Sequence, residues 1–170
     1  MKSFFFLFFF FIVFSNTASS ATCHDQLVDG AKPVIVTPGL NKRTNFLCYS
    51  EMAVLHSGVT RTPLFSAAML TKERIESGRT LSREDNFHEE DLLHPSDRAT
   101  LQDYKGSMKW NLQRGHLVAN KDTGSRQTQY DSFSLANIVP QNGDSNGNLW
   151  SELEQRVRGM AMQRGKIYVI

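Results

Sequence analysis

His116 is the side chain in this sequence best suited to moving a proton. A free imidazole has a pKa of about 6.5, so its neutral form accepts a proton from water near neutral pH. Arg114 and Gly115 precede it, and a glycine permits close backbone approach beside the ring. Two interpretations stay open: a general base that activates water, or a hydrogen-bonded histidine of the core.

Three polar residues nearer the C-terminus extend this candidate chemistry. The amide oxygen of Asn146 suits a hard cation such as Mg²⁺, which keeps most of its waters and tolerates a single protein ligand. An asparagine at a helix entrance equally fits a cap or a turn. Glu154 and Arg158 are four residues apart, so an ion pair along a helix explains them without any part in function.

Asn137 lies in an apolar run with Phe133, Leu135 and Val139. A buried amide needs hydrogen-bond partners, so we expect Asn137 to organise the backbone or the site. The residues that three other kinds of site would need are missing from the sequence. The sequence has no Cys/His cluster for structural zinc, no glycine-rich phosphate loop, and only a histidine and scattered serines toward a serine triad.

The segment that carries these residues is predicted to form strand, loop, strand, turn and helix. The strands are expected over 112–119 and 132–139, the second because Phe133, Leu135 and Val139 alternate before Pro140. The helix is expected because apolar residues recur on one stripe. These residues are Leu149, Trp150, Leu153, Val157 and Met160. A final strand is expected over 166–170.

The residues upstream of this segment predict further strands and one exposed loop. An extended arm over 22–45 should contain a short strand at 34–36, and another strand should cover 46–55. A strand or short helix is expected over 63–70. Six acidic residues and no Lys or Arg between 84 and 97 predict an exposed loop, which leaves the rest of the chain basic. The fold class is therefore α+β, with a mixed or antiparallel central sheet.

Composition excludes several classes of protein. The chain has 170 residues, 40% of them apolar, and a formal charge of +2, which excludes a disordered tail and a strongly basic nucleic-acid coat protein. Two cysteines exclude a disulfide-dense mini-protein. The phenylalanine-rich run that follows Lys2 predicts a signal peptide over 1–21, with a retained membrane anchor as the weaker alternative.

The leader predicts a secreted or periplasmic protein without stable membrane association after cleavage. An oxidising compartment would permit a disulfide between Cys23 and Cys48, and two free thiols are the alternative.

Three short motifs occur in order: Arg114-Gly115-His116-Leu117, then Asn137-Ile138-Val139-Pro140-Gln141, then Asn146 with Trp150 and Leu153-Glu154. Together they resemble the DNA/RNA non-specific endonuclease family, whose catalytic core is the ββα-metal (His-Me) finger. The resemblance covers 46–170 and implies a nuclease domain there. Members continue past the strand matched at 166–170, so the domain is expected to be C-terminally incomplete.

The resemblance also implies roles for individual residues. His116 would be the general base and Asn146 the Mg²⁺ ligand, with Mn²⁺ as a substitute metal. Glu154 would act near the metal's water shell. Arg83 and Arg114 would lie near the scissile phosphate, and Arg158 would contact nucleic acid. Gln113 stands where the family has aspartate, so it would support the site through hydrogen bonds without charge.

The sequence thus predicts a secreted, Mg²⁺-dependent endonuclease that cuts DNA and RNA with little sequence preference and leaves 5′-phosphate ends. A homodimer is left open. Two alternatives also stay open: a catalytically impaired remnant that binds nucleic acid, and an inactive fragment.

Overall fold

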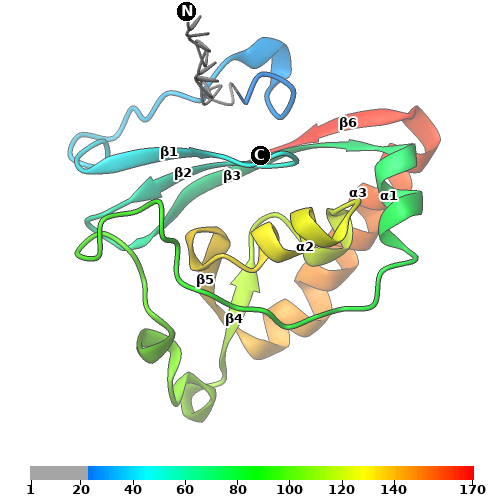
Figure 1. Cartoon of the computed structure of the whole chain (residues 1–170). Coiled ribbons are helices and arrows are strands. Elements are labelled where there is room, and N and C mark those ends of the chain that lie inside the picture. The colour runs from blue at the N-terminus through cyan, green and yellow to red at the C-terminus, as the bar shows by residue number, and fades with distance from the viewer. Residues whose placement is uncertain (1–22) are drawn as a thin grey trace, which may run out of the picture.

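The computed structural model describes residues 23–170, so the signal peptide expected over 1–21 lies outside the described residues. Its main sheet has four antiparallel strands in the order β1-β2-β3-β6, and a separate antiparallel ribbon pairs β4 with β5 (Figure 1). The α+β class is confirmed. The strands are β1 (Thr44–Cys48), β2 (Ala53–Ser57), β3 (Thr62–Thr71), β4 (Leu112–His116), β5 (Ile138–Asn142) and β6 (Lys166–Val169). The α-helices are α1 (Lys72–Gly78), α2 (Arg126–Ser132) and α3 (Ser151–Arg164).

The strand expected over 46–55 is two strands, because the chain turns between Tyr49 and Met52. The amide of Tyr49 donates to the carbonyl of Met52 at 2.9 Å, which closes the turn between β1 and β2. The segment at 63–70 is a strand, β3, and not a helix. It pairs with β2 on one side and with β6 on the other, so Ala68 faces Val169 in the register.

Different segments of the chain pack on the two faces of the main sheet. The helices pack below it, where Leu70 of β3, Ile75 of α1 and Ala161 of α3 join one apolar cluster (Figure 1). The N-terminal segment lies above it, where Leu27 and Cys23 pack on Ala53 and Ala67. No strand forms at 34–36, and Val34 and Val36 are 82% and 86% exposed. An apolar run without a neighbouring strand or face to cover it stays extended in solvent.

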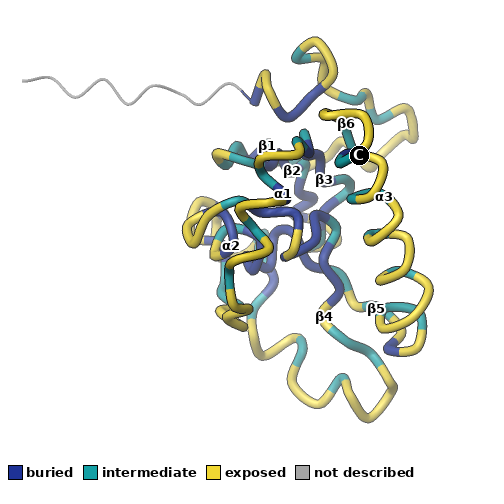
Figure 2. The backbone as a smooth tube through the Cα atoms, turned by 90° about the vertical axis from the view of Figure 1, so that its right-hand side faces the viewer, coloured by how far each residue is buried: buried dark blue, intermediate teal, exposed yellow. Residues whose placement is uncertain are grey.

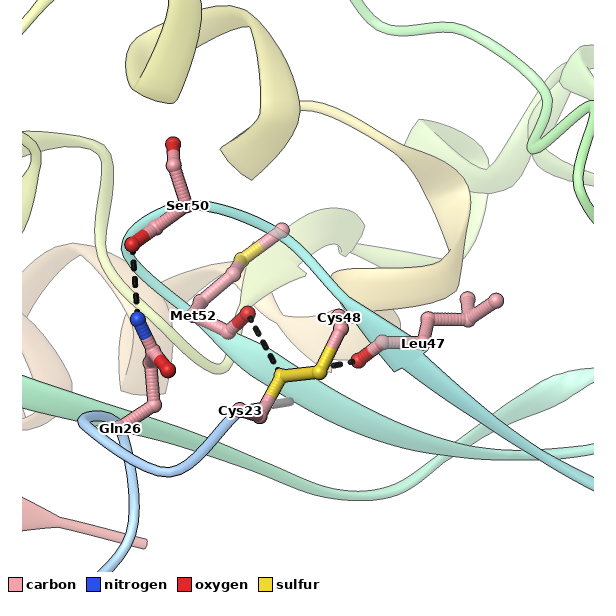
Figure 3. Close-up of a disulfide and its surroundings, with 6 residues drawn as sticks. All are labelled: Cys23, Gln26, Leu47, Cys48, Ser50 and Met52. Atoms are coloured by element: carbon pink, nitrogen blue, oxygen red, sulfur yellow. Dashed lines mark hydrogen bonds between the residues drawn. A yellow bond between two sulfur atoms is a disulfide. The ribbon is translucent and has the colours of Figure 1, made fainter. Parts of the chain in front are cut away.

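A disulfide joins Cys23 to Cys48, whose Cα atoms are 5.5 Å apart. Figure 3 shows Cys23 against the β1–β2 hairpin, with its sulfur 3.9 Å from the carbonyl oxygens of Leu47 and Met52. Gln26 adds a hydrogen bond from its amide to the carbonyl of Ser50 at 2.7 Å. The disulfide therefore fastens the N-terminal segment to the side of the sheet opposite the helices.

The ribbon and helix α3 together form a ββα unit, but its elements differ from the prediction. Residues 126–132 form helix α2, capped by Ser125, and Leu135–Asn137 is a 3₁₀ turn, so β5 begins only at Ile138. The strand predicted at 132–139 is therefore wrong, because an alternating pattern is also compatible with closely packed turns. Pro140 lies inside β5, since a two-stranded ribbon leaves one edge free of hydrogen bonds. Strand β4 ends at His116.

The helix expected from the sequence is α3, and a π-helical turn, Ser145–Trp150, that was not predicted precedes it. Most of the predicted apolar stripe does not face the core, however: Leu149, Leu153 and Met160 are 70%, 47% and 44% exposed. Of that stripe Val157 packs against the core, together with Ala161 and Met162. Figure 2 shows most of the helix exposed, because the sheet covers only one side of it.

Much of the acidic segment at 84–97 is exposed as expected, but Glu90 and Leu93 are buried. The carboxylate of Glu90 accepts hydrogen bonds from the hydroxyls of Tyr49 and Ser134 and from the amide of Leu92. A buried charge needs such partners, so the segment is anchored at its middle. Within residues 23–170, no helix is both long enough and apolar enough to cross a membrane.

Candidate active site

His116 ends strand β4 with its ring packed between two phenylalanines. The ring of Phe133 meets it edge-on at 4.8 Å between centroids, and that of Phe87 lies 5.5 Å away. Burial, followed by the positive charges of Arg83 and Arg114, lowers the pKa of His116 to about 3. The imidazole is therefore neutral at physiological pH. Among the described residues its Nε2 has no hydrogen-bond partner.

Gly115 makes this placement possible by keeping the ribbon tight. It pairs with Val139 of β5, and a Cβ on Gly115 would come within 2.7 Å of the Cβ of Gln141. Any side chain there would push Gln141 away and shift the end of β4, where His116 lies. The close approach expected at this glycine is confirmed.

A cavity of about 230 Å³ opens beside His116. It brings together six residues singled out from the sequence: Arg83, Arg114, His116, Asn146, Glu154 and Arg158. They come from the 79–100 connection, β4, the π-helical turn and α3, so the ββα unit and one long loop build the site jointly.

Gln113 and Asn146 form a direct contact across the mouth of the ribbon. The Nδ2 of Asn146 donates to the Oε1 of Gln113 at 2.8 Å. This bond holds the amino side of the amide, which leaves the Oδ1 of Asn146 as its free acceptor. The structure thus places Gln113 in direct contact with Asn146.

The oxygen donors of this cavity suit a hydrated hard cation. No cluster of three or more His, Cys, Asp or Glu side chains that could hold a metal occurs within residues 23–170. Asn146 offers one neutral oxygen, and the carboxylate of Glu154 lines the same cavity. Such a set fits Mg²⁺, which retains most of its waters and needs few protein ligands.

Arg158 forms ion pairs with two carboxylates. It donates to Asp122 at 2.9 Å and lies 3.7 Å from Glu154, and its side chain is only 15% exposed. Burial raises the pKa of Glu154 and that of Asp122. Asp122 connects this group to the interior, because its backbone carbonyl accepts from the buried guanidinium of Arg74. The ion pair expected between Glu154 and Arg158 is confirmed.

Arg83 and Arg114 are exposed at the cavity and lie against the aromatic rings. The guanidinium of Arg114 lies 3.8 Å from the centroid of Phe87, and that of Arg83 lies 5.1 Å from Phe133. Arg83 also donates to Asp85 at 2.7 Å. Two cations beside a neutral imidazole create a pocket of positive potential that suits a phosphate group.

Asn137 does not line the cavity, and its side chain hydrogen-bonds to the backbone that follows β4. Its Oδ1 accepts from the amide of Val118, and its Nδ2 donates to the carbonyls of Val118 and Ser132. The fully buried side chain thus ties the residues that follow β4 to the end of α2. The structural interpretation of Asn137 agrees with these bonds.

Sequence reasoning missed four residues that shape the site: Phe87, Phe133, Asn120 and Asp122. Asn120 is buried at the cavity with an unpaired Nδ2. The only signal for it and for Asp122 was polar residues shortly after His116. Nothing local to Phe87 or Phe133 shows that they contact an imidazole, since the contact joins distant segments.

Comparison with known proteins gives consistent matches. Residues 30–170 match the family model described as DNA/RNA non-specific endonuclease. Human mitochondrial endonuclease G is 34% identical over 137 residues, which cover 78% of this chain and 42% of that protein. A nuclease of Nostoc is 32% identical over 145 residues, covering 83% and 48%. The chain therefore spans less than half the length of these relatives.

A solved structure shares the fold. The crystal structure of a complex between EndoG and EndoGI, described as showing the mechanism of EndoG inhibition, matches with a TM-score of 0.63 and 25% identity. The match covers 72% of this chain and 50% of that one.

The relatives correct the predicted location. Human and bovine endonuclease G, nuclease 1 of Schizosaccharomyces pombe and a nuclease of Saccharomyces cerevisiae are all named as mitochondrial. These relatives point away from a secreted or periplasmic protein, so that prediction is wrong. The export prediction rested on composition alone, namely a positively charged start followed by an apolar run. Composition distinguishes poorly between an export signal and other targeting segments.

Proposed function

The chain belongs to the DNA/RNA non-specific endonuclease family, and from this we propose that it hydrolyses phosphodiester bonds inside DNA and RNA strands. The observation that carries the proposal is the neutral, buried His116, whose unpaired Nε2 shares a cavity with the exposed cations Arg83 and Arg114. A base without a charge beside two phosphate-binding groups suits attack of water on a phosphodiester.

His116 acts as the general base in this proposal. Its neutral ring takes a proton from the attacking water, a role worth about 10²–10⁴-fold in rate. The resulting imidazolium would be repelled by Arg83 and Arg114. A bound phosphate offsets that repulsion, because an opposite charge nearby favours the protonated ring. The base is therefore strongest when substrate is in place.

Arg83 and Arg114 bind the phosphate oxygens. Guanidinium groups match the geometry of phosphate through paired hydrogen bonds, and their contact with Phe87 and Phe133 limits the motion of both. Such contacts are made to the phosphate backbone, so they do not distinguish one base from another. Little sequence preference and activity on both DNA and RNA follow.

Members of this family are typically metal-dependent, and Asn146 would hold the metal, for which we propose Mg²⁺ with Mn²⁺ as a substitute. When bound, the cation supplies Lewis acidity that stabilises the charge on the phosphate and the leaving oxygen. Gln113 keeps the amide of Asn146 in one orientation. Glu154, which pairs with Arg158, would accept hydrogen bonds from the waters of the metal.

Plasmid and RNA degradation by the purified protein tests this function. We expect cleavage with Mg²⁺, loss of cleavage on addition of EDTA, and recovery with Mn²⁺. His116→Ala should lower the rate by about 10²–10⁴-fold. His94→Ala, which changes an exposed histidine outside the cavity, serves as the control. Full cleavage by His116→Ala, or none by the unaltered protein, would contradict the proposal.

One observation favours a second candidate, a remnant that binds nucleic acid without cutting it. The residue that holds Asn146 is the neutral Gln113, where the family has aspartate. A binding protein of this kind would retard DNA in a gel with strong dependence on salt and would leave it intact with Mg²⁺.

A further inference from the structure

Asn120 lines the cavity beside His116 but takes no part in the mechanism proposed for it. The residue is 7% exposed, and among the described residues no group accepts a hydrogen bond from its Nδ2. A buried donor without a partner lowers stability, so native proteins keep few of them, often at functional sites. Within residues 23–170, only His116 and Asn120 combine a buried, unpaired side-chain atom with a place in this cavity.

The turn that carries Asn120 is fixed by hydrogen bonds to its backbone. This turn is a 3₁₀ helix, Asn120–Asp122, and it begins four residues after His116. The hydroxyl of Thr123 donates to the carbonyl of Asn120 at 2.7 Å, and this bond is buried. The guanidinium of Arg74 in α1 donates to the carbonyl of Asp122. These bonds prevent the turn from shifting to give the amide of Asn120 another partner.

Helix α1 packs directly against the residues that follow this turn. A Cβ on Gly78 would lie 2.3 Å from the backbone oxygen of Thr123, so only glycine permits this approach. The carboxylate of Glu51 accepts from the amide of Gly124 at 2.7 Å and pairs with Arg74 at 3.1 Å. A donor held on such a support needs little reorganisation when an acceptor arrives.

The charges around Asn120 favour an anionic acceptor. Cationic side chains outnumber carboxylates in the lining of this cavity, where Glu154 stands against Arg83, Arg114, Lys121 and Arg158. The oxygens of a phosphate group accept hydrogen bonds from guanidinium and amide donors alike. A phosphate in this cavity would therefore supply the acceptor that the Nδ2 of Asn120 lacks.

We propose that Asn120 is a further catalytic residue, whose Nδ2 donates a hydrogen bond to a non-bridging oxygen of the scissile phosphate. This inference rests on the proposed function and adds a substrate contact to it. A fixed donor directed at an oxygen where negative charge develops binds the transition state more tightly than the substrate. Loss of the donor should therefore lower kcat more than it raises KM.

Two variants of similar size test the contribution to the rate. Asn120→Leu removes the donor and should lower kcat about 10²-fold, while the melting temperature stays equal or rises because a buried unpaired group is gone. Asn120→Asp replaces the donor by a negatively charged acceptor, so kcat should fall at least as far. Asn148→Asp adds the same charge at an exposed asparagine that does not line this cavity, and it is the matched control.

Phosphorothioate substrates test whether Asn120 contacts the phosphate. Sulfur is a weak hydrogen-bond acceptor, and only one of the two stereoisomers places it at the contacted position. For that isomer the oxygen-to-sulfur rate ratio should fall several-fold in Asn120→Leu relative to the unaltered protein. For the other isomer the ratio should be the same in both proteins. Unchanged ratios for both isomers, or a full rate in Asn120→Leu, would overturn the contact.

Binding of dimethyl phosphate, the simplest phosphodiester, separates this contact from the proposed function. In the NMR spectrum of isotope-labelled protein, the side-chain amide signal of Asn120 is identified by its loss in Asn120→Leu. It should shift on addition of the probe, while that of Asn148 should not. A shift together with no cleavage by the unaltered protein would leave the contact standing and remove the nuclease function. Cleavage without a shift, at a full rate in Asn120→Leu, would remove the contact and leave the nuclease function standing.

Discussion

The side-chain amide of Asn146 donates to the Oε1 of Gln113 across 2.8 Å, which joins the turn before α3 to strand β4. The bond fixes which end of the Asn146 amide faces the cavity. A residue that orients a metal ligand typically changes metal affinity by about 10–100-fold when it is lost. We therefore propose that Gln113 is a positioning residue for Asn146, the proposed Mg²⁺ ligand.

Gln113→Ala should raise the Mg²⁺ concentration for half-maximal cleavage by about 10–100-fold, because the amide of Asn146 loses its partner. Gln113→Glu should lower that concentration, since it keeps an acceptor and adds a negative charge near the cation. Titration of cleavage rate with Mg²⁺ measures both. Gln163→Ala, an exposed glutamine of α3, should leave the titration unchanged. An unchanged Mg²⁺ curve in Gln113→Ala would refute the positioning role.

Asp122→Asn should destabilise the fold and impair cleavage together. It leaves the nearly buried Arg158 with one weaker partner, Glu154 at 3.7 Å, and breaking a buried ion pair costs about 3–5 kcal/mol. Thermal unfolding and cleavage rates measure the two effects. Glu152→Gln breaks an exposed pair with Arg156 on the same helix and should change neither. Equal behaviour of the two variants would show that Asp122 does not hold Arg158.

Lowering the pH should reduce the free energy of unfolding, because His116 is buried in its neutral form. Its pKa is about 3 in the folded state and about 6.5 when unfolded, so between these values the unfolded chain binds more protons and stability falls with pH. The loss from this group is about 2 kcal/mol between pH 7 and pH 5.

Denaturant unfolding of the protein and of His116→Gln at both pH values measures this contribution. The variant should lose less stability on acidification than the unaltered protein. His56 also has its pKa lowered by burial, and it remains in both proteins, so its effect cancels in the comparison. An identical loss in the two proteins would mean that His116 is not buried in its neutral form.

Reduction of the Cys23–Cys48 disulfide should destabilise the fold and spare the chemistry. The bond closes a loop with a sequence separation of 25, for which chain entropy predicts about 3.5 kcal/mol. Thermal unfolding with and without a reductant measures the change. The double variant Cys23→Ser, Cys48→Ser should have the same melting temperature as the reduced protein, and adding a reductant should not change it. Unequal melting of these two forms would assign the stabilisation to another cause.

Local signals sufficed for part of the fold and for some residues of the site. The ββα order and the last strand follow from residue types and short spacings. Six of the cavity residues were named from the sequence, but Asn120, which also lines the cavity, was not. Periodicity failed at 132–139 and along α3, where distant neighbours decide which side of an element is covered.

The sequence by itself determined which groups are available for the chemistry: an imidazole, two arginines, an asparagine and a helix carboxylate. Only the tertiary structure decided their states. Phe87 and Phe133 enclose His116 and keep it neutral, Asp122 holds Arg158, and Gln113 orients Asn146. Each of these effects depends on burial and on contacts between segments far apart in the chain. Residue spacing contains no information about either quantity.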